Sequence, residues 1–227
     1  MSGTLALIGG AEFGPENGHH HQLFDPGTTV DLLPTAMAYE DPDSMIAAAG
    51  AHLGELDVQM RVLAAMTRAD AFDSALVETA SSTKALYVPG GSPMHLRSVL
   101  KETPLLSALV SAWEGGATVA VAAESCSVLC SHMVDNRGGA FTVGLGLIPS
   151  MTVISRFDKW SADKRQRTIS LAAPDLVVAG IDEATALVRA PDGTWGVTGS
   201  GGVHVFTGGR AAELSALPRA LNPDAGF

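Results

Sequence analysis

The chain alternates between short apolar runs and longer segments that carry apolar side chains at helical spacing. The apolar runs predict buried strands over residues 4–10, 28–36, 58–66, 85–91 and 119–123. The helical spacing predicts helices over residues 43–53, 70–80, 93–101, 104–114 and from residue 125 onwards. Strands that alternate with helices build a mostly parallel sheet covered on both faces. The pattern therefore predicts an α/β fold of three layers.

The alternation changes after about residue 150. Residues 177–190 and 193–209 have the pattern of hairpins, with turns at residues 191–193 and 199–202. We therefore expect the sheet to gain antiparallel edge strands near the C-terminus. No linker or internal repeat is evident, so we expect a single domain over residues 1–227.

Small or reactive residues follow three of the predicted strands. They are the pairs Gly9-Gly10 and Gly90-Gly91, and Ser125. Parallel sheets bind ligands beyond the carboxyl ends of their strands, which lie at one edge. We therefore expect these three segments to meet at a common site.

The stretch "VAVAAESCSVLC", residues 119–130, has the outline of a nucleophile elbow, in which a strand turns sharply into a helix at a reactive residue. Ala123 and Ser127 lie two residues before and after Ser125, where an elbow favours glycine, and this symmetry predicts Ser125 at the tip. Cys126 is an alternative nucleophile, although a reactive thiolate needs a nearby cation or histidine. Its simpler interpretation is a small side chain that fills the core.

The composition argues against two classes of binding partner, nucleic acids and membranes. The formal net charge is −10 and 46% of the residues are hydrophobic. A nucleic-acid partner is not expected, because no basic stripe is present to neutralise phosphates. No stretch approaches the roughly 20 apolar residues of a membrane span. The N-terminus lacks a basic signal-peptide region, so we expect a cytoplasmic protein without a membrane partner, in which Cys126 and Cys130 stay reduced.

Five features occur along the chain in one order: "LIGGAE", "LYVPGGSPMHL", the serine elbow, "GLGLIP" and "GIDEATALV". In this the chain resembles the peptidase E and cyanophycinase group of serine peptidases, from about residue 4 to about residue 208. These proteins share the flavodoxin-like fold of class I glutamine amidotransferases, and the resemblance implies that fold here. It also implies a serine nucleophile, an oxyanion hole at a glycine pair, and a histidine base after the "GLGL" segment.

The resemblance maps onto this sequence with one chemical departure. Ser125 takes the nucleophile position, Gly90 and Gly91 the oxyanion loop, and Cys126 supplies the backbone N–H after the nucleophile. The histidine position reads Arg156. A guanidinium stays protonated and only donates hydrogen bonds, so it does not activate a serine. Whether the chain is an enzyme is therefore left open.

Further candidates surround this predicted site. Glu124 and Arg156 are expected to form an ion pair, the alternative being that Arg156 binds a substrate carboxylate. His95 lies in the glycine loop and is a substrate-binding candidate. The acid of a triad is sought first at Asp135, and then at Asp158, Asp182 and Glu183.

The sequence "GHHHQ" holds the three adjacent histidines His19, His20 and His21. Alternate side chains of an extended segment point the same way, so a metal site with Glu12 or Glu16 is one interpretation. An exposed loop is the simpler one, and no metal or cofactor is expected.

Three functions remain open. The first is a diverged serine hydrolase, which by resemblance would cleave amide bonds in a small, acidic, peptide-like substrate through Ser125. The second is a catalytically inactive protein that binds a small molecule or regulates through the same pocket. The third is an amidotransferase or hydrolase that depends on Cys126. The expected partner is a small molecule or short peptide, and the chain is expected to be a monomer or a homodimer.

Overall fold

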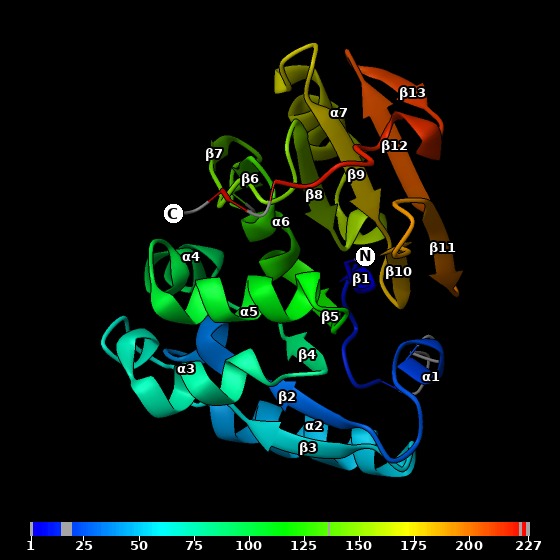
Figure 1. Ribbon diagram of the computed structural model, residues 1–227. Helices are drawn as coiled ribbons and strands as arrows, with labels where there is room; N and C mark the ends of the chain where they lie inside the picture. Colours follow the sequence, from blue (N-terminus) through cyan, green and yellow to red (C-terminus); the bar gives the residue numbers. More distant parts are fainter. Residues whose placement is uncertain (1, 15–19, 136, 223, 226–227) are drawn as a thin grey trace.

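The computed structural model describes residues 2–14, 20–135, 137–222 and 224–225. Two sheets account for most of its strands, with a short separate hairpin (Figure 1). The larger sheet holds, in spatial order, β11 (Trp195–Gly199), β10 (Thr185–Arg189), β1 (Leu5–Ile8), β5 (Thr118–Ala122), β4 (Ala85–Val88), β2 (Thr29–Leu32) and β3 (Gln59–Val62). The smaller sheet holds β13 (Arg210–Ala212), β12 (Val203–Thr207), β9 (Val177–Ile181) and β8 (Met151–Ser155). The hairpin pairs β6 (His132–Val134) with β7 (Phe141–Val143).

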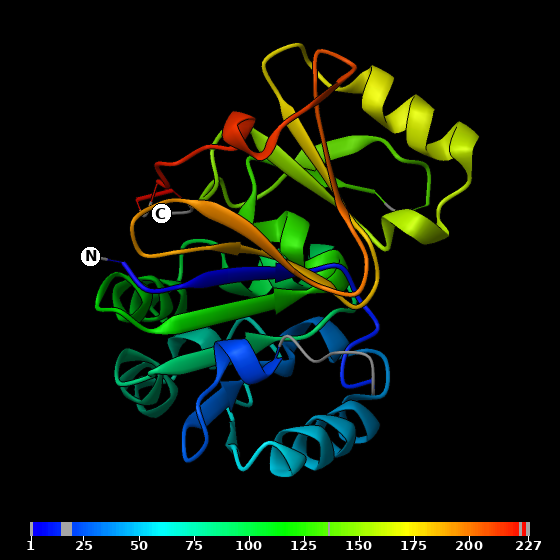
Figure 2. The same ribbon diagram turned by 90° about the vertical axis from the view of Figure 1, so that its right-hand side faces the viewer.

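Helices lie on both sides of the larger sheet. The α-helices are α1 (His20–Leu23), α2 (Pro42–Glu55), α3 (Ser74–Ser81), α4 (Pro93–Leu100), α5 (Pro104–Glu114), α6 (Cys126–Leu129) and α7 (Ala162–Leu171). Short 3-10 turns are η1 (Pro34–Met37), η2 (Asp70–Phe72), η3 (Ala123–Ser125), η4 (Phe157–Lys159) and η5 (Leu214–Ala216). Both views place the smaller sheet and α7 at one end of the molecule and α2 at the other (Figure 2).

Strand periodicity explains how the core divides. Along β1, Leu5 and Leu7 belong to the core cluster that also contains α4 and α5, whereas Ala6 and Ile8 belong to the cluster formed with α2. Strands β4 and β5 alternate in the same way. Successive side chains of a strand point to opposite faces, so an apolar run buried on both faces needs two covering layers. The predicted α/β fold with three layers is confirmed.

The larger sheet is mostly parallel and has an antiparallel edge, as predicted. β1, β5, β4, β2 and β3 run parallel, whereas β10 and β11 run antiparallel. The turn at residues 191–193 joins β10 to β11, and this predicted hairpin turn is confirmed.

The other predicted strand pairings are wrong. Residues 177–190 do not form a hairpin, because β9 pairs with β8 and β12 in the smaller sheet, whereas β10 pairs with β1. Residues 193–209 divide between the two sheets in the same way. Alternating apolar residues identify a strand but do not specify its partner, so the smaller sheet was not anticipated.

The helix predicted from residue 125 is also shorter than expected. It ends at Leu129, where Cys130 turns to an extended conformation and makes a bridge to Ile148. The chain continues as a strand at His132, the first residue of β6. No helix in the described ranges is both long and apolar enough to cross a bilayer.

Candidate functional site

A cleft lies at the carboxyl ends of β1, β4 and β5, where the sequence predicted a site. Its volume is about 660 Å³. It is lined by Ala11, Glu12, Phe13, Met37, Glu40, Met45, Ala48, Pro89, Gly90, Gly91, Glu124, Arg156 and Glu183. The cavity is thus formed by the loops after the three neighbouring parallel strands, the segment from η1 into α2, and the segments after β8 and β9.

The sharp bend after β5 occurs at Ala123. Ala123 immediately follows the last strand residue and has φ of 48°, in the left-handed region that non-glycine residues rarely adopt. Ala123 is the first residue of the 3-10 turn η3, and α6 follows that turn. In a nucleophile elbow the reactive residue occupies this strained position between strand and helix. The residue in that position here has a methyl group and no nucleophile.

Ser125 lies two residues beyond the bend and is fully buried. Its hydroxyl donates a hydrogen bond of 2.6 Å to the carbonyl oxygen of Pro89. Ser125 does not line the cleft, so its placement gives no support to the prediction that it is the nucleophile.

Cys126 is also enclosed by the core. Its thiol lies 3.0 Å from the carbonyl oxygen of Val121 and 3.4 Å from that of Ile8, and its backbone N–H donates to Ala123. Burial raises the pKa of the thiol well above its usual value, and the charges of nearby groups including Glu124 add to the shift. The neutral thiol is a poor nucleophile. The N–H is already used inside the turn, which does not favour the predicted oxyanion role.

Gly90 is the point at which three loops come together. A Cβ atom at this position would lie 2.7 Å from Oε1 of Glu12, 2.8 Å from Cβ of Ala123 and 3.2 Å from Oε2 of Glu124. The backbone N–H of Gly90, the donor expected in an oxyanion hole, donates instead to Oε1 of Glu12 at 2.9 Å. A carboxyl of the protein itself therefore occupies this donor.

The loop after β1 is strained around Glu12. Ala11 and Phe13, on either side of it, both have φ of 55°. A left-handed non-glycine residue costs on the order of 1–2 kcal/mol, and such residues cluster at functional sites. Burial raises the pKa of Glu12 to about 7, opposed by the Gly90 hydrogen bond and increased by the charge of Glu124.

Arg156 projects into the cleft from the end of β8. It also has a left-handed backbone, with φ of 50° and ψ of 43°, and its N–H donates to Gly9 at 2.8 Å. Its guanidinium lies 3.9 Å from Glu124 and 3.8 Å from Glu183. The predicted ion pair with Glu124 is present, but both pairs exceed hydrogen-bond length. Arg156 is therefore loosely held between two carboxylates.

The remaining predicted residues are divided between the cleft and other surfaces. Gly91 and Glu124 line the cleft, whereas His95 does not: its ring contacts the carbonyl oxygen of Met66 at 2.8 Å and packs on Tyr39. Asp135 follows β6 and pairs with Arg137 at 3.2 Å, away from the lining residues. Its pKa is lowered by hydrogen bonds from Arg137.

The histidine run is only partly within the described residues. His19 lies outside them, and the side chain of His21 is not described. His20 is buried at the start of α1, with its Nδ1 atom 2.8 Å from Nε2 of His52. Among the described residues, no group of three His, Cys, Asp or Glu side chains is arranged to hold a metal ion.

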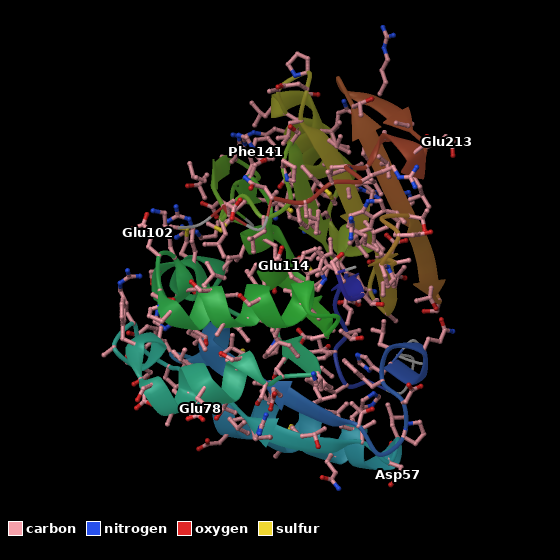
Figure 3. All side chains as sticks on the ribbon, viewed as in Figure 1. Asp57, Glu78, Glu102, Glu114, Phe141 and Glu213 are labelled. Atoms are coloured by element: carbon pink, nitrogen blue, oxygen red, sulfur yellow. The ribbon has the colours of Figure 1, made fainter. Side chains whose placement is uncertain are left out.

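Two of the carboxylates that line the cleft, Glu12 and Glu183, have little support from the sequence alone. Glu12 was considered only as a partner for the histidines, and Glu183 only as one of several possible acids. The available signal for Glu12 was its place two residues after the Gly9-Gly10 strand end. By contrast, Asp57, Glu78, Glu102, Glu114 and Glu213 are exposed carboxylates on the outer surface (Figure 3).

Comparison with known proteins identifies the family. The model of peptidase family S51 matches residues 5–193, most of the chain. The chain belongs to peptidase family S51. The predicted relationship to the peptidase E and cyanophycinase group is thereby confirmed.

Individual relatives of this S51 chain support the assignment. The chain is 29% identical over 157 residues to a cyanophycinase of Synechococcus elongatus, covering 65% of this chain and 49% of the relative. It is 31% identical over 130 residues to one of Trichormus variabilis, covering 53% and 44%. The chain thus spans about half the length of the curated relatives it matches.

Solved structures agree with the fold. A crystal structure of a peptidase from an acI-B1 Actinobacterium superposes with a TM-score of 0.80 at 27% identity, covering 93% of each chain. A candidate peptidase E protein from Listeria monocytogenes EGD-e gives a TM-score of 0.61 at 14% identity, covering 91% of this chain and 99% of that one. The second likeness concerns the fold alone.

Proposed function

We propose that this S51 family member binds a small ligand in its cleft without serine hydrolysis. The observation that carries the proposal is Ala123: this strained residue, which directly follows β5 and begins η3, has no hydroxyl or thiol. A serine hydrolase needs an exposed nucleophile at this bend and a base within hydrogen-bond reach of it.

Three further observations support the loss of hydrolysis. The Ser125 hydroxyl is buried and donates to Pro89. Arg156 stands at the position of the family histidine, and a guanidinium does not accept the proton of a serine. The Gly90 N–H is already bonded to Glu12, so it is not free to stabilise an oxyanion.

A serine hydrolase that acts through Ser125 is the second candidate, and membership of a peptidase family favours it. It requires the Ser125 side chain to leave its buried bond to Pro89 and reach the cleft. The Cys126-dependent alternative requires a thiolate, which the raised pKa of the buried thiol opposes.

The test is labelling with a fluorophosphonate probe, followed by mass-spectrometric mapping, alongside hydrolysis of a panel of short peptides. We expect the wild type and Ser125→Ala to behave alike, with no labelling and no hydrolysis. The double variant Ala123→Ser, Arg156→His tests whether the bend can present a nucleophile, and we expect labelling at residue 123. Labelling of the wild type at Ser125 that disappears in Ser125→Ala would instead establish the second candidate.

A further inference from the structure

The inside of the cleft has an excess of carboxyl groups. Among the described residues, Glu12, Glu124, Glu183 and Glu40 line it, against a single lining cation, Arg156. Lys159 pairs with Glu183 at 3.3 Å but does not line the cleft. Because the pairs of Arg156 are 3.8–3.9 Å long, this one guanidinium does not satisfy the carboxylates around it.

One oxygen of Glu12 is left without a partner. Oε1 accepts the N–H of Gly90, whereas Oε2 is buried and has no hydrogen-bond partner among the described residues. A buried acceptor without a donor is costly, so such atoms in native proteins are normally satisfied by a ligand, a proton or water. This oxygen is a separate observation from the excess of carboxylates in the cleft, and it indicates a missing hydrogen-bond donor.

The cleft also has apolar lining residues. They include Phe13, Met37, Met45 and Ala48. Phe13 is fixed against the buried ring of Tyr87, with ring centroids 5.0 Å apart. A ligand that suits both the carboxylates and the apolar side chains has a positively charged, hydrogen-donating group and an apolar stem.

We propose that the cleft binds an organic cation, a primary ammonium or amidinium on an apolar stem, and that Glu12 is the carboxyl that receives it. This inference rests on the proposed function, since it gives the chemistry of the ligand for the same cleft. The cation donates to Glu12 and Glu124, while its stem lies along Phe13 and the two methionines.

Binding of this cation is linked to release of a proton. The groups that face Glu12 are the Gly90 N–H after β4, Glu124 in η3, Arg156 after β8, and Tyr87 and Cys126, whose own raised pKa values reflect in part the charge of Glu12. With a pKa of about 7, the Glu12 carboxyl is partly protonated at neutral pH. A cation that pairs with the carboxylate displaces this proton.

The experiment is calorimetric titration with benzylamine and benzamidine as cations, benzamide as the neutral analogue and benzoate as the anionic one. We expect the cations to bind in preference to the other two. Their affinity should rise about tenfold from pH 6 to pH 8, as the ionised fraction of a group with a pKa near 7 goes from about one-tenth to nine-tenths. Titration in phosphate and in Tris, whose ionisation enthalpies differ, measures the released proton directly.

Glu12→Gln is the decisive variant, and Glu40→Gln is its matched control because it removes a carboxyl from the same cleft. We expect Glu12→Gln to weaken cation binding at pH 8 and abolish the pH dependence, whereas Glu40→Gln keeps it. Circular dichroism verifies that both variants fold. Failure of the cations to bind, preference for benzoate, or a pH dependence that survives in Glu12→Gln would overturn the inference.

The two proposals fail separately. Labelling of wild-type Ser125 with cation binding that depends on Glu12 would overturn the proposed function and leave this inference standing. Absence of labelling together with binding of benzoate alone would overturn this inference and leave the proposed function standing.

Discussion

Asp31 is a buried carboxyl and Glu12 is a half-buried one that lines the cleft, and their hydrogen-bond partners differ. Asp31, in β2, is 1% exposed and accepts hydrogen bonds from Nε and Nη2 of Arg61, at 2.5 and 2.9 Å, and from the hydroxyl of Thr83. Glu12 accepts one backbone N–H, and its second oxygen has no hydrogen-bond partner among the residues that the structure describes. The carboxylate of Asp31 is therefore satisfied within the fold, whereas that of Glu12 is only partly satisfied.

The difference follows from where each residue lies. Asp31 sits within the sheet, where Arg61 on the neighbouring strand β3 is directly opposite in register. Glu12 lies in a strained loop beyond the strand ends, where the nearest cation, Arg156, is shared with two other carboxylates. Buried charges are stabilising only when their partners satisfy them, so the two sites respond differently to mutation.

Arg61→Met makes Asp31 resemble Glu12 and has the largest expected effect. It leaves a buried carboxylate with Thr83 as its remaining side-chain partner, so we expect a loss of about 3 kcal/mol in the free energy of unfolding. Urea denaturation measures it. Adding Asp31→Asn should recover part of the loss, because the uncompensated charge is then gone. A loss below about 1 kcal/mol in Arg61→Met would contradict this account of the pair.

Glu12→Gln removes the ionisable carboxyl of Glu12, the less satisfied of the two. The folded-state pKa of Glu12 is raised from 4.5 to about 7, so its contribution to stability is complete below pH 4.5 and is lost as the pH rises through 7. We expect the free energy of unfolding of Glu12→Gln to be close to that of the wild type near pH 4.5 and to exceed it by about 3 kcal/mol at pH 8. Denaturation across this range checks the slope, and Glu40→Gln should show no such trend.

Ser125→Ala tests whether the Ser125 hydroxyl, like the Asp31 carboxylate, stabilises the fold through its hydrogen bond. Losing the hydroxyl leaves the Pro89 carbonyl without this donor, and we expect a loss of about 1 kcal/mol. Ligand binding should be unchanged. Ser127→Ala is the matched control, since its hydroxyl bonds in the same way to the carbonyl of Glu124 at 3.0 Å. An effect of Ser125→Ala on ligand affinity with no effect on stability would place the hydroxyl in the cleft.

Arg156→Gln has the smallest expected effect on stability. Its side chain is 45% exposed and its ion pairs are long, so we expect a change below about 1 kcal/mol. Arg137→Gln, which removes the exposed pair with Asp135, should give a similarly small value. A large loss from Arg156→Gln alone would show that this cation is a structural partner of Glu12 and Glu124.

The elements could be predicted well where local periodicity defines them. The helix predicted over residues 104–114 is α5, and the helix predicted over residues 93–101 ends one residue earlier, as α4. Helix α6 could not be predicted in the same way, because its end depends on the bridge from Cys130 to Ile148. The pairing of β9 with β8 rather than β10 is similarly non-local.

The sequence predicted the location of the candidate site better than it predicted the arrangement of the residues in it. Strand ends after β1, β4 and β5 do converge, as the strand order of an α/β sheet requires. The symmetry of small residues around Ser125 suggested an elbow tip there, but the backbone bends two residues earlier, at Ala123. The spacing of small residues does not encode which residue adopts a left-handed conformation.

The sequence by itself determined the layers, the parallel core of the larger sheet, the edge at which a site forms and the presence of Arg156 where the family has histidine. These follow from local periodicity, strand-end glycines and residue identity. Only the tertiary structure decided that Ser125 is buried, that Ala123 takes the bend, and that Glu12 reaches a backbone N–H 78 residues away at Gly90. The physical reason is that burial and the raised pKa of Glu12 arise from groups brought together by folding, which no local pattern specifies.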